Sequence, residues 1–142
     1  MTLKHLLHGE LTEVIISAFY KVYHTLGYGF LETVYRNALT VELGRRGLQV
    51  KRETPIEVFY EGVSVGTYRI DLLVADKVIV EVKTKVGLTA VDDKQLGNYL
   101  RATPFEVGLL FNFGPEPKLQ RMIYTNDRKQ PVYLSASSVS SV

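Results

Sequence analysis

The sequence predicts an α/β fold in which α-helices flank a mixed central β-sheet. The first third of the chain spaces its apolar residues as amphipathic helices do, and the middle third alternates β-branched and aromatic runs with turn residues. A further helical segment and a continuous apolar run follow. The 142 residues, 46% hydrophobic and 23% charged, suit one compact domain without a long linker. We expect a single domain over residues 1–134 and a flexible, serine-rich tail over residues 135–142.

Two helices are predicted at the start of the chain. From Glu10 to His24, six apolar residues recur at three-and-four spacing, which indicates one buried helix face: Leu11, Val14, Ile15, Ala18, Phe19 and Val22. The glycines of "LGYG" end this helix. A second helix is predicted from about Leu31 to Arg46, with Gly47 as its C-terminal cap. Its inward residues are expected to be Leu31, Val34, Tyr35, Ala38 and Leu39.

The segment "IEVFYEGVSVGTYRIDLLVADKVIVEVKT" predicts a meander of three or four strands, because turn residues at positions 61–62 and 75–77 interrupt its apolar runs. A third helix is predicted over about residues 91–102. After it, "FEVGLLFNF" predicts a buried strand and "RMIYTN" one more strand at a sheet edge. This element order favours helices packed on a mixed sheet.

The composition excludes several classes of site. The chain has no cysteine, which rules out disulfides, thiolate metal ligands and cysteine nucleophiles. Its net charge of +2 is compatible with an anionic partner without requiring one. The N-terminal segment carries Lys4, Glu10 and Glu13 inside its apolar pattern, unlike a secretion signal or a membrane span. We therefore expect a cytoplasmic protein that does not associate with a membrane.

The stretch "KVIVEVKTK", residues 77–85, places Glu81 and Lys83 in a strand that is otherwise apolar on both faces. Residues two apart in a strand share a face, so both side chains point the same way. If the preceding hairpin turns on residues 75–77, Asp71 lies opposite Glu81 on that face. Two carboxylates across a sheet repel one another unless a cation lies between them or one of them is protonated.

A divalent cation is the economical explanation of this acidic pair. Carboxylate oxygens suit a hard ion such as Mg²⁺, with Mn²⁺ as a substitute. Lys83 beside the ion could orient an attacking water or stabilise charge on a phosphate oxygen. The alternative is an ordinary solvated face of an antiparallel sheet, on which acids and lysines are common. The apolar neighbours of Glu81 argue against that alternative, since they indicate a buried strand in which an unpaired carboxylate is costly.

An acidic residue followed on a neighbouring strand by Glu-x-Lys resembles the PD-(D/E)XK nuclease superfamily. Two further motifs extend the resemblance. "GFLETVY", with Gly29, Glu32 and Tyr35, resembles the signature of the GxxExxY proteins. "QLGNY", with Gln95 and Tyr99, resembles the QxxxY helix motif of RecB-type nucleases within the superfamily.

The resemblance covers roughly residues 10–113 and implies a restriction-endonuclease-like core. It departs from the superfamily's name at Ile70, where proline would stand, and proline has no part in the chemistry. Catalytic roles are implied for six residues: Glu32, Asp71, Glu81, Lys83, Gln95 and Tyr99. Among them the implied metal ligands are Glu32, Asp71 and Glu81. The resemblance makes Lys83 the catalytic lysine, whereas Gln95 and Tyr99 would touch the site or the nucleic acid.

The sequence therefore predicts an Mg²⁺-dependent nuclease that hydrolyses phosphodiester bonds in nucleic acid, with DNA placed ahead of RNA as the partner. Two alternatives stay open. One is a catalytically weak or inactive nucleic-acid-binding module of the same fold. The other is a homodimeric interaction domain whose polar residues serve the interface. Stabilisation of the protein by Mg²⁺ or Mn²⁺ would favour the nuclease over both alternatives.

Overall fold

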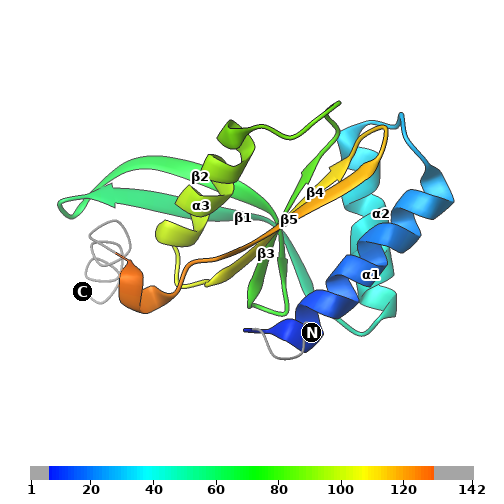
Figure 1. Ribbon diagram of the computed structural model, residues 1–142. Coiled ribbons are helices and arrows are strands. Elements are labelled where there is room, and N and C mark those ends of the chain that lie inside the picture. Colours follow the sequence, from blue (N-terminus) through cyan, green and yellow to red (C-terminus); the bar gives the residue numbers. More distant parts are fainter. Residues whose placement is uncertain (1–6, 130–142) are drawn as a thin grey trace.

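The computed structural model describes residues 7–129 as a mixed five-stranded sheet with three helices (Figure 1). The strands lie in chain order, and only the contact between β3 and β4 is parallel. This arrangement confirms the predicted fold class. The elements are α1 (Gly9–Leu26), α2 (Glu32–Arg45), β1 (Val50–Tyr60), β2 (Val63–Val74), β3 (Val78–Lys83), α3 (Ala90–Arg101), β4 (Val107–Phe113) and β5 (Pro117–Ile123), followed by a 3₁₀ turn at Asn126–Arg128.

The helices cover opposite faces of the sheet, as Figure 1 shows, with α1 and α2 on one face and α3 on the other. The first face forms the α1/α2 core, in which aromatic rings stack between helix and strand; its largest members include Phe19, Tyr35, Phe111 and Phe113. The second face forms the smaller α3 core, which includes Ile56, Ile70, Ile79, Leu96 and Leu100. Strand β3 contributes alternate residues to both cores, which confirms the predicted burial of this strand on both faces.

Some predicted boundaries shift in the structure. Strand β1 begins at Val50, ahead of the predicted meander, because the three residues after Val50 are charged and exposed and give no apolar signal. Strand β5 begins at Pro117, which is tolerated because an edge strand need not donate every backbone hydrogen bond. The predictions that Leu31 and Val34 point inward were wrong, since these residues are 78% and 36% exposed. Leu31 precedes the first helical residue of α2, so the periodicity of the helix does not govern it.

The three-residue turn predicted between β2 and β3 is confirmed by the register, in which Val74 pairs with Val78. Ala75 and Asp76 adopt left-handed backbone conformations in this turn, with φ of 54° and 55°. Among residues 7–129 no helix is long and apolar enough to cross a membrane. The predicted tail, residues 135–142, lies outside the described residues, so that boundary stays a prediction.

Partway along the β1–β2 hairpin, the side chains that pointed toward one core begin to point toward the other. Leu72 and Val74 belong to the α1/α2 core, but Ile70, two residues earlier, belongs to the α3 core. Strict alternation would put all three on one face. The change occurs at Asp71, where Glu53 on the neighbouring stretch of β1 has a left-handed φ of 51°. The outer half of the hairpin therefore lies against α3, and Asp71 stands at the bend.

Candidate active site

Asp71 and Glu81 lie side by side where strands β2 and β3 part. The regular pairing of these strands ends at Leu72 and Val80. Beyond that pair, the Asp71 backbone N–H donates to Glu81 Oε2 at 2.8 Å, and the Val82 N–H donates to Asp71 Oδ2 at 2.8 Å. Each carboxylate thus accepts a hydrogen bond from the backbone of the opposite strand. The two side chains are held by the split in the sheet itself, which fixes their positions without help from a flexible loop.

Glu81 is the most deeply buried acid of this pair, at 4% exposure. Burial and the neighbouring charge of Asp71 raise the pKa of Glu81 to about 8. The Asp71 N–H and the Lys83 ammonium act in the opposite direction but do not offset these two effects. The metal-free site therefore resists carrying both negative charges at neutral pH. A bound cation would relieve this electrostatic cost.

Lys83 lies two residues beyond Glu81 in strand β3, and helix α3 holds its ammonium group. Lys83 Nζ donates to Gln95 Oε1 at 3.2 Å. Tyr99, one helical turn after Gln95, is 6% exposed. Burial, and then the charges of Glu81 and Asp71, raise the pKa of Tyr99 to about 12, so its hydroxyl stays protonated at neutral pH. The structure thus brings Gln95 of the QxxxY-like motif to Lys83, and Tyr99 close enough to the acidic pair to feel its charge.

Glu32 is the first residue of α2, and the loop before it is fastened to the helix by Tyr35. The buried Tyr35 hydroxyl donates to the carbonyl of Gly27 and accepts from the Phe30 N–H at 3.2 Å. Gly29 has φ of 119°, a conformation that residues with a side chain rarely adopt. The three residues of the "GFLETVY" motif therefore have separate roles. The glycine makes the turn, the tyrosine fixes the loop, and Glu32 faces the site.

The charges that shift the pKa of Glu32 show which groups lie near it. Burial and the charge of Asp71 raise the pKa of Glu32, while the charges of Arg36, Lys83 and Lys85 lower it. Glu32 therefore shares the electrostatic field of the acidic pair and of the lysine. Its carboxylate contacts the guanidinium of Arg36 at 3.7 Å, and the same guanidinium lies 3.1 Å from Asp71 Oδ1. Arg36 stands between the two acids.

Arg36 was not among the predicted site residues. The signal for it is the spacing from Glu32, because residues four apart on a helix lie on one face, and the acid-to-arginine order is the favourable one. Lys85 was also missed. Its ammonium lies 2.6 Å from the buried Asp92 at the start of α3, and Asn112 of β4 exchanges hydrogen bonds with the Lys85 backbone. These contacts fix the loop that leads from β3 to α3.

The donor set fits a hard divalent cation. Asp71 and Glu81 supply adjacent carboxylate oxygens, one of them buried, and oxygen donors are the ligands of Mg²⁺ and Mn²⁺. Within residues 7–129 no three acidic or histidine side chains are grouped closely enough to hold a metal ion by themselves. This agrees with Arg36 standing between Glu32 and Asp71. Two protein carboxylates are enough for Mg²⁺, which usually keeps several water ligands.

Comparisons with known proteins give one family match. The family model described as the PD-(D/E)XK nuclease superfamily matches residues 9–123. A solved structure titled "Crystal structure of SSO0001" is similar at 18% sequence identity and a TM-score of 0.46, over 94% of this chain and 67% of that chain. No curated protein matches the sequence at a significant level.

Proposed function

We propose a function from the premise that this chain belongs to the PD-(D/E)XK nuclease superfamily. It is an Mg²⁺-dependent nuclease that hydrolyses phosphodiester bonds, and DNA ranks ahead of RNA as its substrate. The observation that carries the proposal is the interlocked pair of Asp71 and Glu81 at the split between two strands. An acidic pair of this kind, with Glu81 buried and Asp71 partly buried, is costly for a protein that only has to fold. Its cost is explained if the pair exists to bind a cation.

The roles of the residues follow from their positions. Asp71 and Glu81 would hold the ion, with Glu32 as a further ligand, and the bound ion would activate water and polarise the phosphate. Lys83 would place positive charge beside the scissile phosphate, where negative charge grows in the transition state. Gln95 orients the Lys83 ammonium through the hydrogen bond at 3.2 Å. Tyr99 keeps its proton and can donate to a phosphate or a base.

Cleavage assays with Mg²⁺ or Mn²⁺ test the proposal. Linear, circular, single-stranded and branched DNA, and RNA, would serve as substrates. We expect Lys83→Ala to abolish cleavage while the melting temperature changes little, because this side chain lies at the margin of the α3 core. Lys51→Ala is the matched control, since Lys51 pairs with Asp76 on the surface. Equal activity of Lys83→Ala and the wild type would contradict the assignment.

One observation favours a second candidate, a nucleic-acid-binding module without turnover. The guanidinium of Arg36 lies 3.1 Å from Asp71 Oδ1 and already supplies a positive charge beside one of the two carboxylates. If this charge substitutes for a metal ion, the protein would bind nucleic acid and Mg²⁺ would have no effect on its stability. Failure to cleave any of the substrates, together with binding that is independent of divalent cations, would support this candidate.

A further inference from the structure

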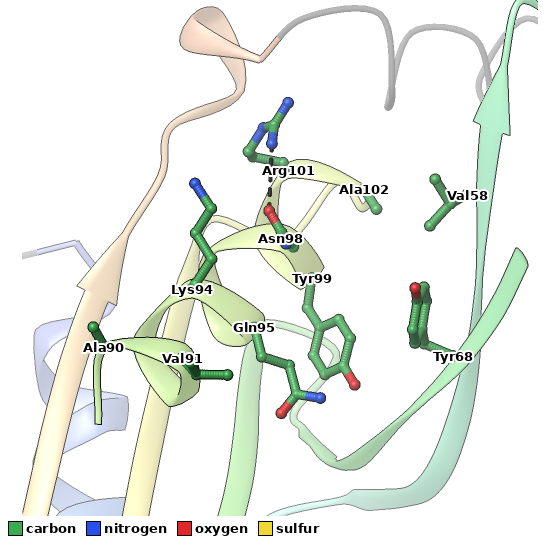
Figure 2. Close-up of a pocket in the computed structure, with 10 residues that line it drawn as sticks. All are labelled: Val58, Tyr68, Ala90, Val91, Lys94, Gln95, Asn98, Tyr99, Arg101 and Ala102. Atoms are coloured by element: carbon green, nitrogen blue, oxygen red, sulfur yellow. Dashed lines mark hydrogen bonds between the residues drawn. The ribbon is translucent and has the colours of Figure 1, made fainter. Parts of the chain in front are cut away.

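A pocket with a volume of about 690 Å³ lies between helix α3 and the outer half of the β1–β2 hairpin (Figure 2). Its size falls within the range of small-molecule sites. One wall is the face of α3 that carries Gln95 and Tyr99, and the opposite wall is formed by Val58 and Tyr68 of the hairpin. The change of face at Asp71 creates this pocket, because it turns the outer hairpin toward α3.

Tyr68 presents an open aromatic ring in the pocket. The residue is 51% exposed, and its ring centroid lies 5.8 Å from that of Tyr99 with the planes tilted by 50°. Gly66 is the next residue on this face of β2, and a Cβ placed there would lie 4.0 Å from the Tyr68 ring. Because Gly66 has no side chain, nothing at that position covers the ring. A flat apolar group can therefore stack on Tyr68.

The other lining residues add polar and positive groups to this aromatic surface. Gln95 and Asn98 offer amide groups that can hydrogen-bond a base edge. Lys94 and Arg101 line the margin of the pocket, where they can attract a phosphate backbone. Aromatic stacking surfaces combined with positive charge are the means by which proteins bind unpaired bases. A base inside a duplex offers no free face for such stacking, so the chemistry selects a single strand.

The pocket adjoins the proposed catalytic centre at Gln95. Gln95 lines the pocket, and its Oε1 atom accepts the hydrogen bond from Lys83 Nζ at 3.2 Å. A base held in the pocket would thus lie beside the residue that holds the Lys83 ammonium. This adjacency favours a nucleic-acid segment over an unrelated apolar ligand.

We propose that the pocket binds one unpaired base of a single-stranded DNA or RNA segment, stacked on Tyr68, next to the phosphate that Lys83 contacts. The inference rests on the proposed nuclease function and names the class of its substrate. It predicts a preference for single strands, or for duplexes with an unpaired base, over fully paired duplexes.

Intrinsic fluorescence tests this inference directly, because the chain contains no tryptophan. Tyr68→Trp places the chain's single tryptophan in the pocket, where it can be excited at a wavelength that the tyrosines do not absorb. In the metal-free protein, which should not cleave under the proposed function, we expect oligothymidine and oligouridine to quench this fluorescence and a blunt duplex to leave it largely unchanged. Tyr60→Trp is the control, since Tyr60 is 66% exposed on the same hairpin and does not line the pocket. Equal quenching of the two variants would overturn the proposal.

Binding affinities measured with fluorescein-labelled oligothymidine, oligouridine and duplex provide a second readout. Loss of one stacked base lowers affinity by about 5- to 150-fold, and we expect Tyr68→Ala to fall in this range. Tyr68→Phe keeps the ring and should bind within about twofold of the wild type. Tyr60→Ala should bind as the wild type does. An unchanged affinity in Tyr68→Ala, or equal affinity for duplex and single strand, would also overturn the proposal.

The two proposals fail in different ways. A protein that binds single strands through Tyr68 but cleaves none of the substrates would overturn the nuclease function and support the pocket. A protein that cleaves, but whose Tyr68→Ala variant binds and cleaves single strands as the wild type does, would overturn the pocket alone.

Discussion

Strand β3 has two faces of opposite character. Toward α1 and α2 it presents Val78, Val80 and Val82, all fully buried in a core of stacked aromatic rings. Toward α3 it presents Ile79 and then Glu81 and Lys83, so that charged groups follow one apolar residue. The same strand therefore supports the fold on one side and holds the candidate site on the other.

The difference shows that the residues that stabilise the fold and the residues of the candidate site alternate along one pleated strand. Burial of the apolar face helps to offset the conformational entropy that the chain loses on folding. The charged face adds an electrostatic cost, visible in the raised pKa of Glu81, which the α1/α2 core must offset. Substitutions on the two faces should consequently affect different observables, and the following predictions test that separation.

The largest loss of stability is expected on the apolar face. Phe111 is fully buried and stacks on Phe19 with a centroid distance of 4.3 Å. Phe111→Ala should lower the free energy of unfolding by about 3–5 kcal/mol in a denaturant titration, because it removes a large side chain and leaves a cavity. Lys83→Ala, on the other face, should change it by less than about 1 kcal/mol. Similar losses of unfolding free energy in the two variants would contradict the separation of the two faces.

The second effect concerns the pH dependence of the metal-free protein. The folded-state pKa of Glu81, about 8, lies above the ordinary value of 4.5. Between these values the folded state binds more protons than the unfolded chain, so the free energy of unfolding falls as pH rises and the loss is complete above about pH 8. Glu81→Gln keeps an acceptor for the Asp71 N–H and removes this charge.

We therefore expect Glu81→Gln to be more stable than the wild type at pH 8 and above, by an amount on the order of a few kcal/mol, in denaturant titrations with EDTA. The difference between the two proteins should shrink toward pH 5, where Glu81 is protonated in the folded protein. A constant difference across this range would show that Glu81 titrates as an ordinary carboxyl.

A smaller effect is expected in the loop before α2. Tyr35→Phe removes the hydroxyl that bonds Gly27 and Phe30 and keeps the ring in the α1/α2 core. It should cost about 1 kcal/mol of stability by thermal or denaturant unfolding. Cleavage should also fall, because the loop positions Glu32. Tyr60→Phe, at an exposed tyrosine, should change neither quantity.

The sequence allowed the helices, the meander and the approach of Asp71 to Glu81 to be predicted, because each depends on local spacing or on the length of one turn. The length of the turn at residues 75–77 was sufficient to place the two acids together. The place of Arg36 between Glu32 and Asp71 depends on how α2 packs against the sheet, which local spacing does not specify.

The pocket could not be predicted for a related reason. It requires the hairpin to change face at Asp71, and the left-handed φ of Glu53 that accompanies the change has no signature in that residue type. Tyr68 reads from the sequence as an ordinary strand residue. Only the packing of the outer hairpin against α3 shows that its ring meets Tyr99. The roles assigned to the six predicted site residues stay predictions until cleavage is measured.

The most direct test of the account is whether Mg²⁺ stabilises the protein through Asp71. At a concentration about one hundred times its dissociation constant, a bound ion adds about 2.7 kcal/mol to the free energy of unfolding. We expect a shift of this size in the wild type and in Asp76→Asn, a surface control paired with Lys51, and little or none in Asp71→Asn. Absence of a shift in the wild type, or an equal shift in Asp71→Asn, would contradict the claim that the split between β2 and β3 is a metal site.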